Sequence, residues 1–325
     1  MRTLRWGLLG TGRVTRWLIA ALRASARNQM VGAASRTPSR AEEFAREWAL
    51  PRAFGSYEAM LDDPGIDVVY NALPNHLHAE WTIAATRRGK HVLCEKPLAL
   101  TPGDVDRMAD AARTAGVVVA EAFMYRHHPQ TERVKDLVDG GAVGALRLVR
   151  GSFTFTLTRT DDVRLDPAKG GGSLWDVGCY PVSYARLLAG AEPAETFGWQ
   201  TLGESGVDEA FAGQLRFDSG AMAQVDCGFR MPFRTRVEVV GREGVIVVPR
   251  PYKPGTHETI VIARADETTS VEISGPELYS GEVEDMADAV LLGREPRISL
   301  ADSRGNVAAL QALLRAAREG RPVQV

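Results

Sequence analysis

Short apolar runs alternate with amphipathic stretches over the first 123 residues, and this alternation limits the possible folds more than any other feature of the chain. Leu4–Gly10 is a compact apolar run, and Val14–Ala24 then carries apolar residues at helical spacing. The order repeats along the chain. The predicted strands are Leu4–Gly10, Met30–Ser35, Val68–Leu73, Val92–Cys94 and Val117–Ala120, and the predicted helices are Val14–Ala24, Ser39–Trp48, Ala79–Arg88 and Thr101–Ala115. A βαβα order of this kind predicts a parallel, doubly wound sheet.

Residue preferences place several helix ends. Ser39 is the predicted N-terminal cap of the second helix, because Glu42 follows three residues later. Thr101 is the predicted cap of a later helix, and Gly116 is expected to end that helix.

A glycine-containing loop joins the first predicted strand to the first predicted helix. It consists of Gly10, Thr11, Gly12, Arg13 and Val14. The first glycine permits a tight turn, and the second lets backbone N–H groups approach a pyrophosphate at the helix N-terminus. Thr15 replaces the third glycine of the usual G-x-G-x-x-G pattern. Because the loop follows an N-terminal strand inside a βαβ unit, we expect it to bind a dinucleotide.

The end of the second predicted strand indicates which dinucleotide is bound. NAD sites usually place an acid there to hold the ribose 2′-hydroxyl group. This chain has Ser35, Arg36 and Thr37 instead. A hydroxyl and a guanidinium group suit a 2′-phosphate, which a carboxylate would repel. We therefore expect NADP as the cofactor, with NAD as the less favoured alternative.

The pattern changes after residue 123. A helix over 129–139 leads to a long strand, Leu146–Thr158, and glycines 170–172 open a helix that runs to Leu188. Further strands follow with only short turns between them. They are Phe211–Phe217, Ala221–Phe229, Arg236–Val240, Val245–Val248, Thr259–Ala263 and Ser270–Ile273. This order predicts a mainly antiparallel sheet.

We therefore expect an α/β chain with two domains. Residues 1–123 would form a doubly wound Rossmann domain, and residues 124–325 an α+β domain with a large sheet for substrate binding and oligomerisation. The last two predicted helices, Glu282–Leu292 and Leu300–Glu319, are able to pack back onto the first domain.

Composition and charge exclude several classes of protein. The formal net charge of −2 lacks the basic footprint of a nucleic-acid binder. No apolar run approaches the roughly 18 residues of a membrane span, and no secretory signal precedes the first strand. Cys94, Cys179 and Cys227 are too far apart in the sequence for a zinc motif, so no metal site is expected. Unpaired thiols suit a reducing compartment, and we expect a cytoplasmic protein.

Two motifs carry candidate chemistry. Glu95 and Lys96 end a strand of the parallel sheet, where ligands of such sheets bind. Asp176 and Tyr180 follow the glycine turn and are four residues apart, so they share one face of a helix. A nearby ammonium group lowers the pKa of a phenol, which makes Tyr180 beside Lys96 a usable proton donor or acceptor.

These motifs resemble the glucose–fructose oxidoreductase / inositol dehydrogenase (GFO/IDH/MocA) family of Rossmann oxidoreductases. The resemblance covers essentially the whole chain, and its motifs occur in the family's order. They are Gly10–Thr15, Pro74–His78, Glu95–Pro97, Glu121–Arg126, Gly170–Pro181 and Glu282–Met286. Tyr180 stands where many members have a histidine. In this respect the chain resembles the tyrosine-containing sugar dehydrogenase and dihydrodiol dehydrogenase branch.

The resemblance implies roles for individual residues. Lys96, after which the family typically has a cis proline, resembles the lysine that orients substrate, and Asp176 resembles the acid that positions a substrate hydroxyl. Asn75 and His78 resemble residues that line the nicotinamide-ribose pocket. We also expect Leu73 and Glu95 at the cofactor site, and the candidate substrate contacts are Arg126, Arg164, Trp175 and Asp176. Arg126 and Arg164 are equally interpretable as structural ion-pair partners.

The combined hypothesis is a hydride transfer between NADP and an aldose, keto-sugar or polyol, in a cleft between the domains. Trans-dihydrodiol dehydrogenase and nucleotide-linked keto-sugar reductase activities are alternatives. A non-catalytic regulator that senses NADP or a sugar is an alternative of another class. The resemblance also implies homodimers or tetramers that associate through the C-terminal sheet, since large exposed apolar patches usually mark interfaces.

Overall fold

The computed structural model of the protein describes residues 2–325, which form two compact units. One unit contains the residues up to His127 together with Tyr279–Arg304, and the other contains His128–Leu278 together with Gly305–Val325. The chain therefore leaves the first unit a few residues later than the sequence pattern suggested, and a C-terminal stretch returns to it.

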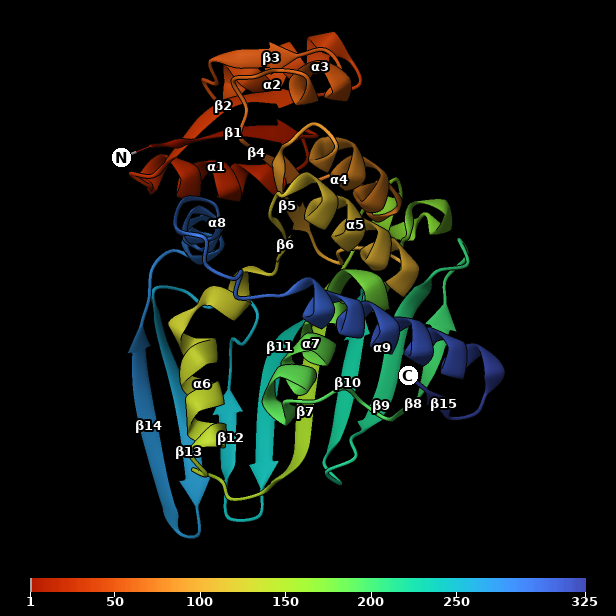
Figure 1. The fold of residues 1–325 in the computed structure, drawn as a ribbon. Helices are drawn as coiled ribbons and strands as arrows, with labels where there is room; N and C mark the ends of the chain where they lie inside the picture. Colours follow the sequence, from red (N-terminus) through yellow and green to blue (C-terminus); the bar gives the residue numbers. More distant parts are fainter. Residues whose placement is uncertain (1) are drawn as a thin grey trace. The chain divides into compact units, whose positions relative to one another are not determined.

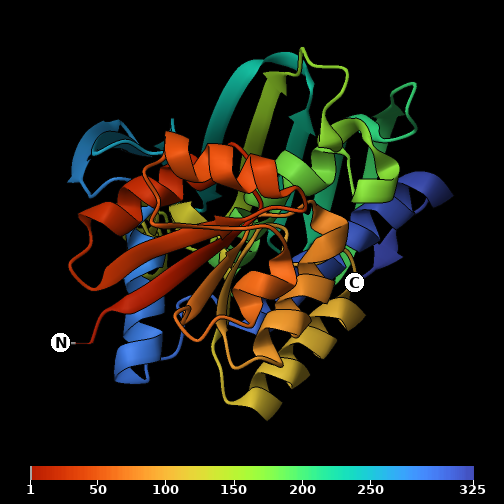
Figure 2. The same cartoon turned by 90° about the horizontal axis from the view of Figure 1, so that it is seen from above.

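The first unit contains a six-stranded sheet in the order β3-β2-β1-β4-β5-β6, and its neighbouring strands are all parallel. The strands are β1 Leu4–Leu9, β2 Asn28–Ala34, β3 Arg52–Phe54, β4 Val68–Asn71, β5 His91–Glu95 and β6 Val119–Ala122. The helices are α1 Thr15–Ala24, α2 Pro38–Glu47, α3 Tyr57–Leu61, α4 His78–Thr86, α5 Pro102–Ala115 and α8 Ser280–Leu292, with short 3₁₀ turns η1 Asn75–Leu77 and η2 Met124–His127. Helices cover both faces of the sheet, so the predicted doubly wound fold is confirmed (Figure 2).

Local signals explain most, but not all, of the helix ends. The side chain of Thr101 accepts a hydrogen bond from the Asp104 amide at 3.0 Å, and Gly116 ends α5 with a left-handed φ of 66°. The prediction for α2 was wrong, since Thr37 is the N-cap residue and Ser39 lies inside the first turn. Pro38 explains the difference, because its fixed φ suits the first position of a helix.

Two short elements of the first unit, β3 and α3, were not predicted. Each has five residues or fewer, which is too short for a hydrophobic period to show. Ser56 caps α3 by accepting a hydrogen bond from the Ala59 amide at 3.1 Å. Strand β3 pairs with β2 and forms the edge of the sheet.

Helix α8 completes the core of the first unit. Val283 and Met286 of α8 are buried against a cluster that includes Trp6 and Tyr70 of the sheet. Arg27, at the start of β2, donates hydrogen bonds to the carboxylates of Glu284 and Asp288 on α8. Figure 1 shows α8 beside α1, although more than 250 residues separate Arg27 from its α8 partners in the sequence.

The second unit contains a nine-stranded sheet in the order β14-β13-β12-β11-β7-β10-β9-β8-β15. All neighbours are antiparallel except β7 and β10, which confirms the expected mainly antiparallel sheet. The strands are β7 Leu146–Thr156, β8 Glu195–Leu202, β9 Asp208–Arg216, β10 Met222–Gly228, β11 Arg230–Gly241, β12 Val245–Val248, β13 His257–Arg264, β14 Glu267–Ser274 and β15 Val323–Gln324. Strands β8 and β15 and the first half of β11 were not predicted.

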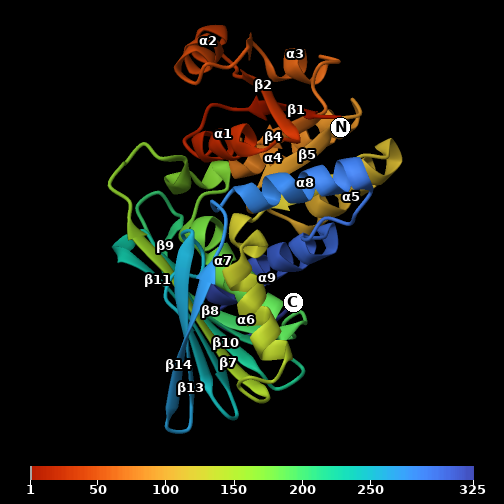
Figure 3. The same ribbon diagram turned by 90° about the vertical axis from the view of Figure 1, so that its left-hand side faces the viewer.

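Helices cover one face of this second sheet. They are α6 Pro129–Asp139, α7 Cys179–Ala189 and much of α9 Leu300–Glu319, and Figure 3 shows α6 and α7 on the same side of the strands. Helix α7 approaches β7 very closely at Gly151. A Cβ atom at that position would lie 2.6 Å from Pro181 and 2.9 Å from the Tyr252 hydroxyl, so only glycine permits this packing. The close approach fixes the helix that carries Tyr180 against the sheet.

Candidate active site

The glycine loop at the end of β1 has the geometry of a phosphate-binding turn. Gly10 adopts a φ of 91°, and a Cβ atom there would lie 3.2 Å from the side chain of Leu73. Thr15 is fully buried, and its hydroxyl donates a 2.6 Å hydrogen bond to the Gly12 carbonyl. Val14, the N-cap residue of α1, has no polar side chain to cap the helix. The first amides of α1 are therefore suited to bind an anion.

The end of β2 opens onto a pocket in the same unit. The pocket has a volume of about 390 Å³, and Arg36, Tyr57, His76 and Trp81 contribute to its lining. Burial raises the pKa of Tyr57, while a hydrogen bond from Arg36 acts in the opposite direction. Tyr57 and Trp81 pack edge to face with ring centroids 4.8 Å apart. An exposed guanidinium group thus stands at the mouth of an aromatic pocket, close in the chain to Ser35.

Glu95 and Lys96 lie at the carboxyl end of β5, and the Lys96–Pro97 peptide bond is cis, as the family resemblance implied. Glu95 is almost fully buried and accepts hydrogen bonds from the Tyr70 hydroxyl and from the Lys96 amide. The following turn is also held, because the Leu98 amide donates a 2.8 Å hydrogen bond to Glu121. Burial raises the pKa of Glu121 to about 7.

His78 has a different environment from the one expected of a residue that lines a pocket. Its side chain is fully buried, with Nδ1 2.9 Å from the Pro97 carbonyl and Nε2 2.7 Å from the Leu73 carbonyl. Burial lowers the pKa of His78 to about 4, against the two carbonyl contacts, which act to raise it. At pH 7 the neutral ring carries one N–H and donates to one of the two carbonyls. His78 therefore links the loops that follow β4 and β5 from inside the unit, and it is not placed to exchange protons with a ligand.

Arg126 is held by an ion pair within the first unit. Its guanidinium is 8% exposed and donates a 2.9 Å hydrogen bond to Asp302, at the start of α9. Arg126 was expected to be either a substrate contact or a structural ion-pair partner. The ion pair with Asp302 favours the structural role.

In the second unit, three glycines lead into a helical segment whose first turn is a π-turn, Leu174–Gly178. The sequence pattern predicted a single continuous α-helix here, and the π-turn corrects that prediction. Single π-turns occur frequently at functional sites. Asp176 lies within this turn, and Tyr180 lies in the first turn of α7. Four residues make nearly one full turn in either geometry, so both side chains remain on similar faces.

A buried carboxylate holds the start of this segment. Asp208 on β9 accepts hydrogen bonds from the Ser173 hydroxyl at 2.7 Å and from the Leu174 amide at 2.8 Å. Gly172 makes this contact possible, since a Cβ atom there would lie 2.3 Å from Asp208 Oδ1. Burial raises the pKa of Asp208 to about 6.

Arg164 is brought next to Asp176. Its Nε donates a 2.6 Å hydrogen bond to Asp176 Oδ2, and its Nη1 donates a 3.1 Å hydrogen bond to Asp162. The coulombic attraction of Asp176 is the main cause that raises the pKa of Arg164 above its usual value. The second unit therefore places a charged pair in the segment where the sequence indicated substrate-binding groups.

Tyr180 is 4% exposed and packs among aromatic rings. Its ring centroid lies 5.2 Å from that of Phe153 and 5.5 Å from that of Tyr252. The ammonium of Lys253 lies 5.7 Å from the Phe153 ring centroid. Trp175, a predicted substrate contact, is 8% exposed.

Within each unit, the structure groups many of the predicted residues. Gly10, Gly12, Ser35 and Arg36 lie at the carboxyl ends of β1 and β2, and Leu73, Asn75 and Lys96 follow β4 and β5. The sequence did not identify the residues contributed by other elements, namely Arg40, Tyr57, Trp81, Asp162, Ser173 and Asp208. Of these, only Arg40 could have been suspected from the sequence, because it lies four residues after Arg36. In the structure its Nε donates a 3.3 Å hydrogen bond to the Thr11 hydroxyl.

Among the described residues, no cluster of three or more His, Cys, Asp or Glu side chains could hold a metal ion. Every helix in that part of the chain is also too short or too polar to span a bilayer. The three cysteines are buried, and none of them forms a disulfide bond.

A parallel sheet with a glycine loop after β1 and an open pocket after β2 defines a dinucleotide-binding Rossmann domain. Residues 4–123 match the "Oxidoreductase family, NAD-binding Rossmann fold", and residues 131–247 match the "GFO/IDH/MocA C-terminal domain". The chain belongs to the GFO/IDH/MocA family of oxidoreductases. A nicotinamide dinucleotide is accordingly its cofactor.

Proteins of similar sequence and structure have several activities. The chain is 37% identical to D-xylose 1-dehydrogenase (NADP⁺) 2 of Haloferax volcanii, over 99% of this chain and 100% of that one. It is 31% identical to trans-1,2-dihydrobenzene-1,2-diol dehydrogenase of Xenopus laevis, over 92% and 93% of the two chains. A 3-ketoreductase of Actinomadura kijaniata, solved with NADP and TDP-benzene, superposes with a TM-score of 0.92 at 30% identity and covers 97% of this chain and 98% of that one.

Proposed function

We propose that this protein is an NADP-dependent oxidoreductase that transfers a hydride between nicotinamide and a carbohydrate-like hydroxyl or carbonyl group. The observation that carries the proposal is the short segment that presents Asp176, paired with Arg164, and Tyr180, packed among aromatic rings. A carboxylate and a phenol on one segment can bind one hydroxyl group and exchange a proton with another. NADP supplies or accepts the hydride when it is bound.

The chain's own residues would divide the remaining work. Tyr180 donates a proton to the substrate oxygen or accepts one from it. Lys96 places an ammonium group beside that oxygen, which stabilises negative charge as the carbonyl forms or is reduced. Asp176 accepts a hydrogen bond from a neighbouring substrate hydroxyl and so fixes the orientation of the reacting carbon.

The preference for NADP follows from the residues after β2. Arg36 offers a guanidinium group at the pocket, whose lining also includes Glu58 and Glu80, and Ser35 precedes it in the chain. Neither Ser35 nor Arg36 repels a 2′-phosphate. Arg13, Thr11 and the amides of the glycine loop would contact the pyrophosphate. The NADP-dependent relative from Haloferax volcanii supports the same assignment.

The substrate class rests on the comparisons. A xylose dehydrogenase relative favours an aldose or polyol. The dihydrodiol dehydrogenase relative keeps an aromatic diol as an alternative. The similarity to a 3-ketoreductase solved with TDP-benzene keeps a nucleotide-linked keto-sugar as another. A regulator that only senses NADP or a sugar would need none of Lys96, Asp176 and Tyr180, and their joint presence argues against it.

A substrate screen tests this proposal. The purified protein is assayed with NADP⁺ or NAD⁺ against D-xylose, D-glucose, myo-inositol and a trans-dihydrodiol, and with NADPH against free keto-sugars and dTDP-linked keto-sugars. We expect turnover of at least one free carbohydrate, faster with NADP than with NAD. Stoichiometric NADPH binding without turnover of any compound in either direction would favour the regulator instead.

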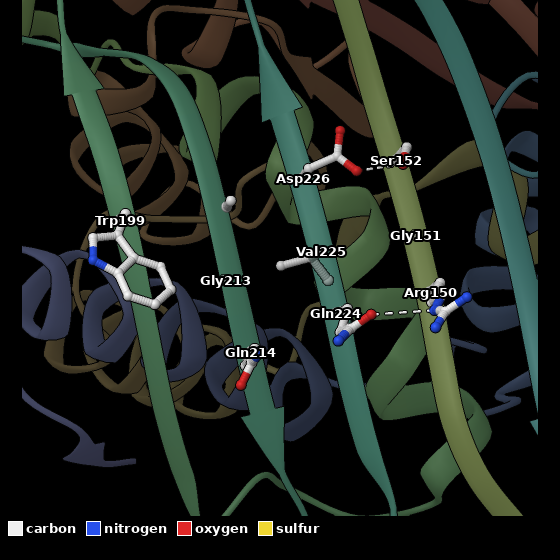
Figure 4. A pocket seen from close by; sticks show the side chains of 10 residues that line it. Arg150, Gly151, Ser152, Trp199, Gly213, Gln214, Gln224, Val225 and Asp226 are labelled. Carbon is white, nitrogen blue, oxygen red and sulfur yellow. Dashed lines mark hydrogen bonds between the residues drawn. The ribbon is translucent and has the colours of Figure 1, made fainter.

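We also propose that the protein is a cytoplasmic homodimer or tetramer that associates through the open face of the nine-stranded sheet. Figure 4 looks onto this face, away from the helices, and shows a shallow hollow beside Trp199. The face is more polar than the sequence suggested, since Arg150 bonds Gln224 and Ser152 bonds Asp226 across it. Trp199 and Met222 nevertheless expose 64% and 51% of their surface.

A further inference from the structure

We propose that Arg164 is a positioning residue that keeps Asp176 as a carboxylate and fixes its direction, so that the site accepts a hydrogen bond from a substrate hydroxyl. The part about the substrate hydroxyl rests on the proposed function. The claim that Arg164 sets the ionisation of Asp176 concerns only residues of the second unit. It replaces the earlier expectation that Arg164 contacts the substrate itself.

The side-chain geometry supports this role. The Nε of Arg164 donates to Asp176 Oδ2 at 2.6 Å, which is a short charge-assisted hydrogen bond. Asp176 has 15% of its side chain exposed, whereas Arg164 has 40% exposed. A carboxylate as buried as this one needs a partner to stay ionised, because desolvation disfavours the charged form.

Arg164 is itself held in place from two directions. Asp162 accepts hydrogen bonds from the Arg164 amide and from its Nη1, both at 3.1 Å. The Arg164 carbonyl in turn accepts a 2.9 Å hydrogen bond from the Gly172 amide, two residues before the π-turn. Gly171 must be a glycine for this contact, since a Cβ atom there would lie 2.5 Å from the Arg164 carbonyl oxygen. The arginine is therefore anchored to the segment that carries Asp176.

The other polar groups around Asp176 come from several elements. Asp162 precedes the 3₁₀ turn Val163–Leu165, and its carboxylate is paired with Arg164. Asp208 on β9 is occupied by Ser173 and the Leu174 amide. Cys227 on β10 lies 3.5 Å from the Ser173 hydroxyl. From α7, the Cys179 thiol contacts the Asp176 carbonyl, and Tyr180 follows it.

Arg164 thus places a positive charge directly against the Asp176 carboxylate. Removing that charge shifts the balance toward a protonated Asp176, because burial also disfavours the charged form. A protonated carboxyl group donates a hydrogen bond, so it would compete with the substrate hydroxyl for the role of donor.

The direct test measures the ionisation of Asp176 and needs no substrate. The protein labelled with ¹³C at the aspartate side-chain carboxyls is titrated as its NADP complex, and the resonance absent from Asp176→Asn identifies Asp176. We expect Arg164→Gln to raise the Asp176 midpoint by about 1–3 pH units, the range typical for loss of an adjacent cation. Arg164→Lys should retain most of the parental value because it keeps the charge. An unchanged midpoint in Arg164→Gln overturns the proposal.

The matched control is Arg159→Gln. Arg159 belongs to the same loop and pairs with the exposed Asp161, so its loss should leave the Asp176 midpoint where it was. An equal shift in Arg159→Gln would mean that general loop charge, and not the Arg164 contact, sets the ionisation, and this too overturns the proposal. If Arg164→Gln does not fold, Arg164→Met takes its place, since it also removes the charge but keeps a long, flexible side chain, and an unchanged Asp176 midpoint in that variant overturns the proposal.

A second experiment measures the pH dependence of kcat/KM with D-xylose and saturating NADP⁺. The acidic limb of the kcat/KM profile should move to higher pH in Arg164→Gln by the same amount as the NMR midpoint, mainly through KM. A profile that keeps its shape while kcat/KM falls uniformly would indicate a purely structural role. If the parent protein does not turn over D-xylose, the assay uses the carbohydrate that the substrate screen identifies. If no compound of the screen is turned over, the proposed function is wrong, and the NMR titration still decides the role of Arg164.

Discussion

Arg36 illustrates how one residue can select a cofactor. It stands directly after β2, where sites for NAD usually offer a carboxylate to the ribose. Arg36 and Tyr57 line the same pocket, where burial raises the pKa of Tyr57 and the positive charge of Arg36 has a smaller effect that acts to lower it. A planar guanidinium with several fixed donors suits a phosphate better than an ammonium group would.

Arg36→Ala should weaken NADP binding by about 1.5–3 kcal/mol, the range for a hydrogen bond to a charged group, and should leave NAD binding almost unchanged. The reason is that only NADP carries the 2′-phosphate. Titration calorimetry with both cofactors provides the measurement. Arg46→Ala, at an exposed position in the last turn of α2, is the control. Equal affinity of the parent protein for the two cofactors would contradict the assignment.

Tyr180 is the proposed proton-transfer residue, and the structure reduces the number of alternatives to it. His78 is fully buried, and both ring nitrogens lie against backbone carbonyls, so it cannot replace Tyr180. Lys96 remains as the alternative.

Tyr180→Phe removes only a hydroxyl group and should leave folding and NADP binding intact. Turnover should fall about 10²–10⁴-fold, as is typical when a general acid–base group is lost. Lys96→Ala should cost at least as much, and the double variant should be little worse than the worse single one, since the two act as a unit. These values come from steady-state assays at saturating NADP and sugar. Retention of more than about a third of parental turnover, with chemistry rate-limiting, would transfer the role to Lys96.

At the scale of elements, the π-turn and α7 form the rigid support of the site in the second unit. Asp208 caps the start of this support from β9, and Gly172 leaves room for it. The same burial that excludes water also raises the pKa of Asp208 to about 6. The capping contact therefore has an energetic cost at neutral pH, where the carboxyl group is ionised.

The sign of this effect is testable. Because the pKa of Asp208 is higher in the folded protein than the usual value of about 3.9, the folded state binds more protons, and stability decreases as pH rises between these two values. Asp208→Asn keeps an acceptor oxygen but cannot ionise. Relative to the parent protein, its free energy of unfolding should therefore improve by about 2 kcal/mol between pH 4.5 and pH 7.5. Urea unfolding at both pH values measures this difference, and a constant difference would contradict it.

At the scale of the whole molecule, the nine-stranded sheet has one face covered by helices and one open face. Trp199 and Met222 are large apolar side chains exposed on the open face. They lie among paired polar residues, so the face combines apolar contacts with polar groups, as many protein interfaces do.

We expect a dimer or larger assembly by light scattering at micromolar concentration. Trp199→Glu combined with Met222→Glu should shift the protein toward monomer, because both changes place charges on the open face. Trp17→Glu is the control, since Trp17 is 59% exposed on α1, which belongs to the other unit. A monomeric parent protein would refute the proposed association.

The sequence alone determined those features whose causes lie within a few residues of one another. Thr101 and Gly116 bound α5 through their own side-chain and backbone preferences. The glycine loop, the alternation of strands and helices, and Arg36 after β2 are equally local, so the Rossmann domain and its cofactor loop were predictable. Lys96, Asp176 and Tyr180 could be proposed as catalytic residues because they lie in compact motifs.

Only the tertiary structure decided how distant segments meet. Asp208 lies 35 residues from Ser173 in the sequence. Arg27, next to β2, binds α8 across more than 250 residues. Neither pairing leaves a pattern in the local sequence. His78 shows the same limit, since its motif is typical of a pocket residue, yet packing turns the ring inward onto two carbonyls. Burial and long-range hydrogen bonds depend on which surfaces come together, and residue preferences along the chain do not encode that.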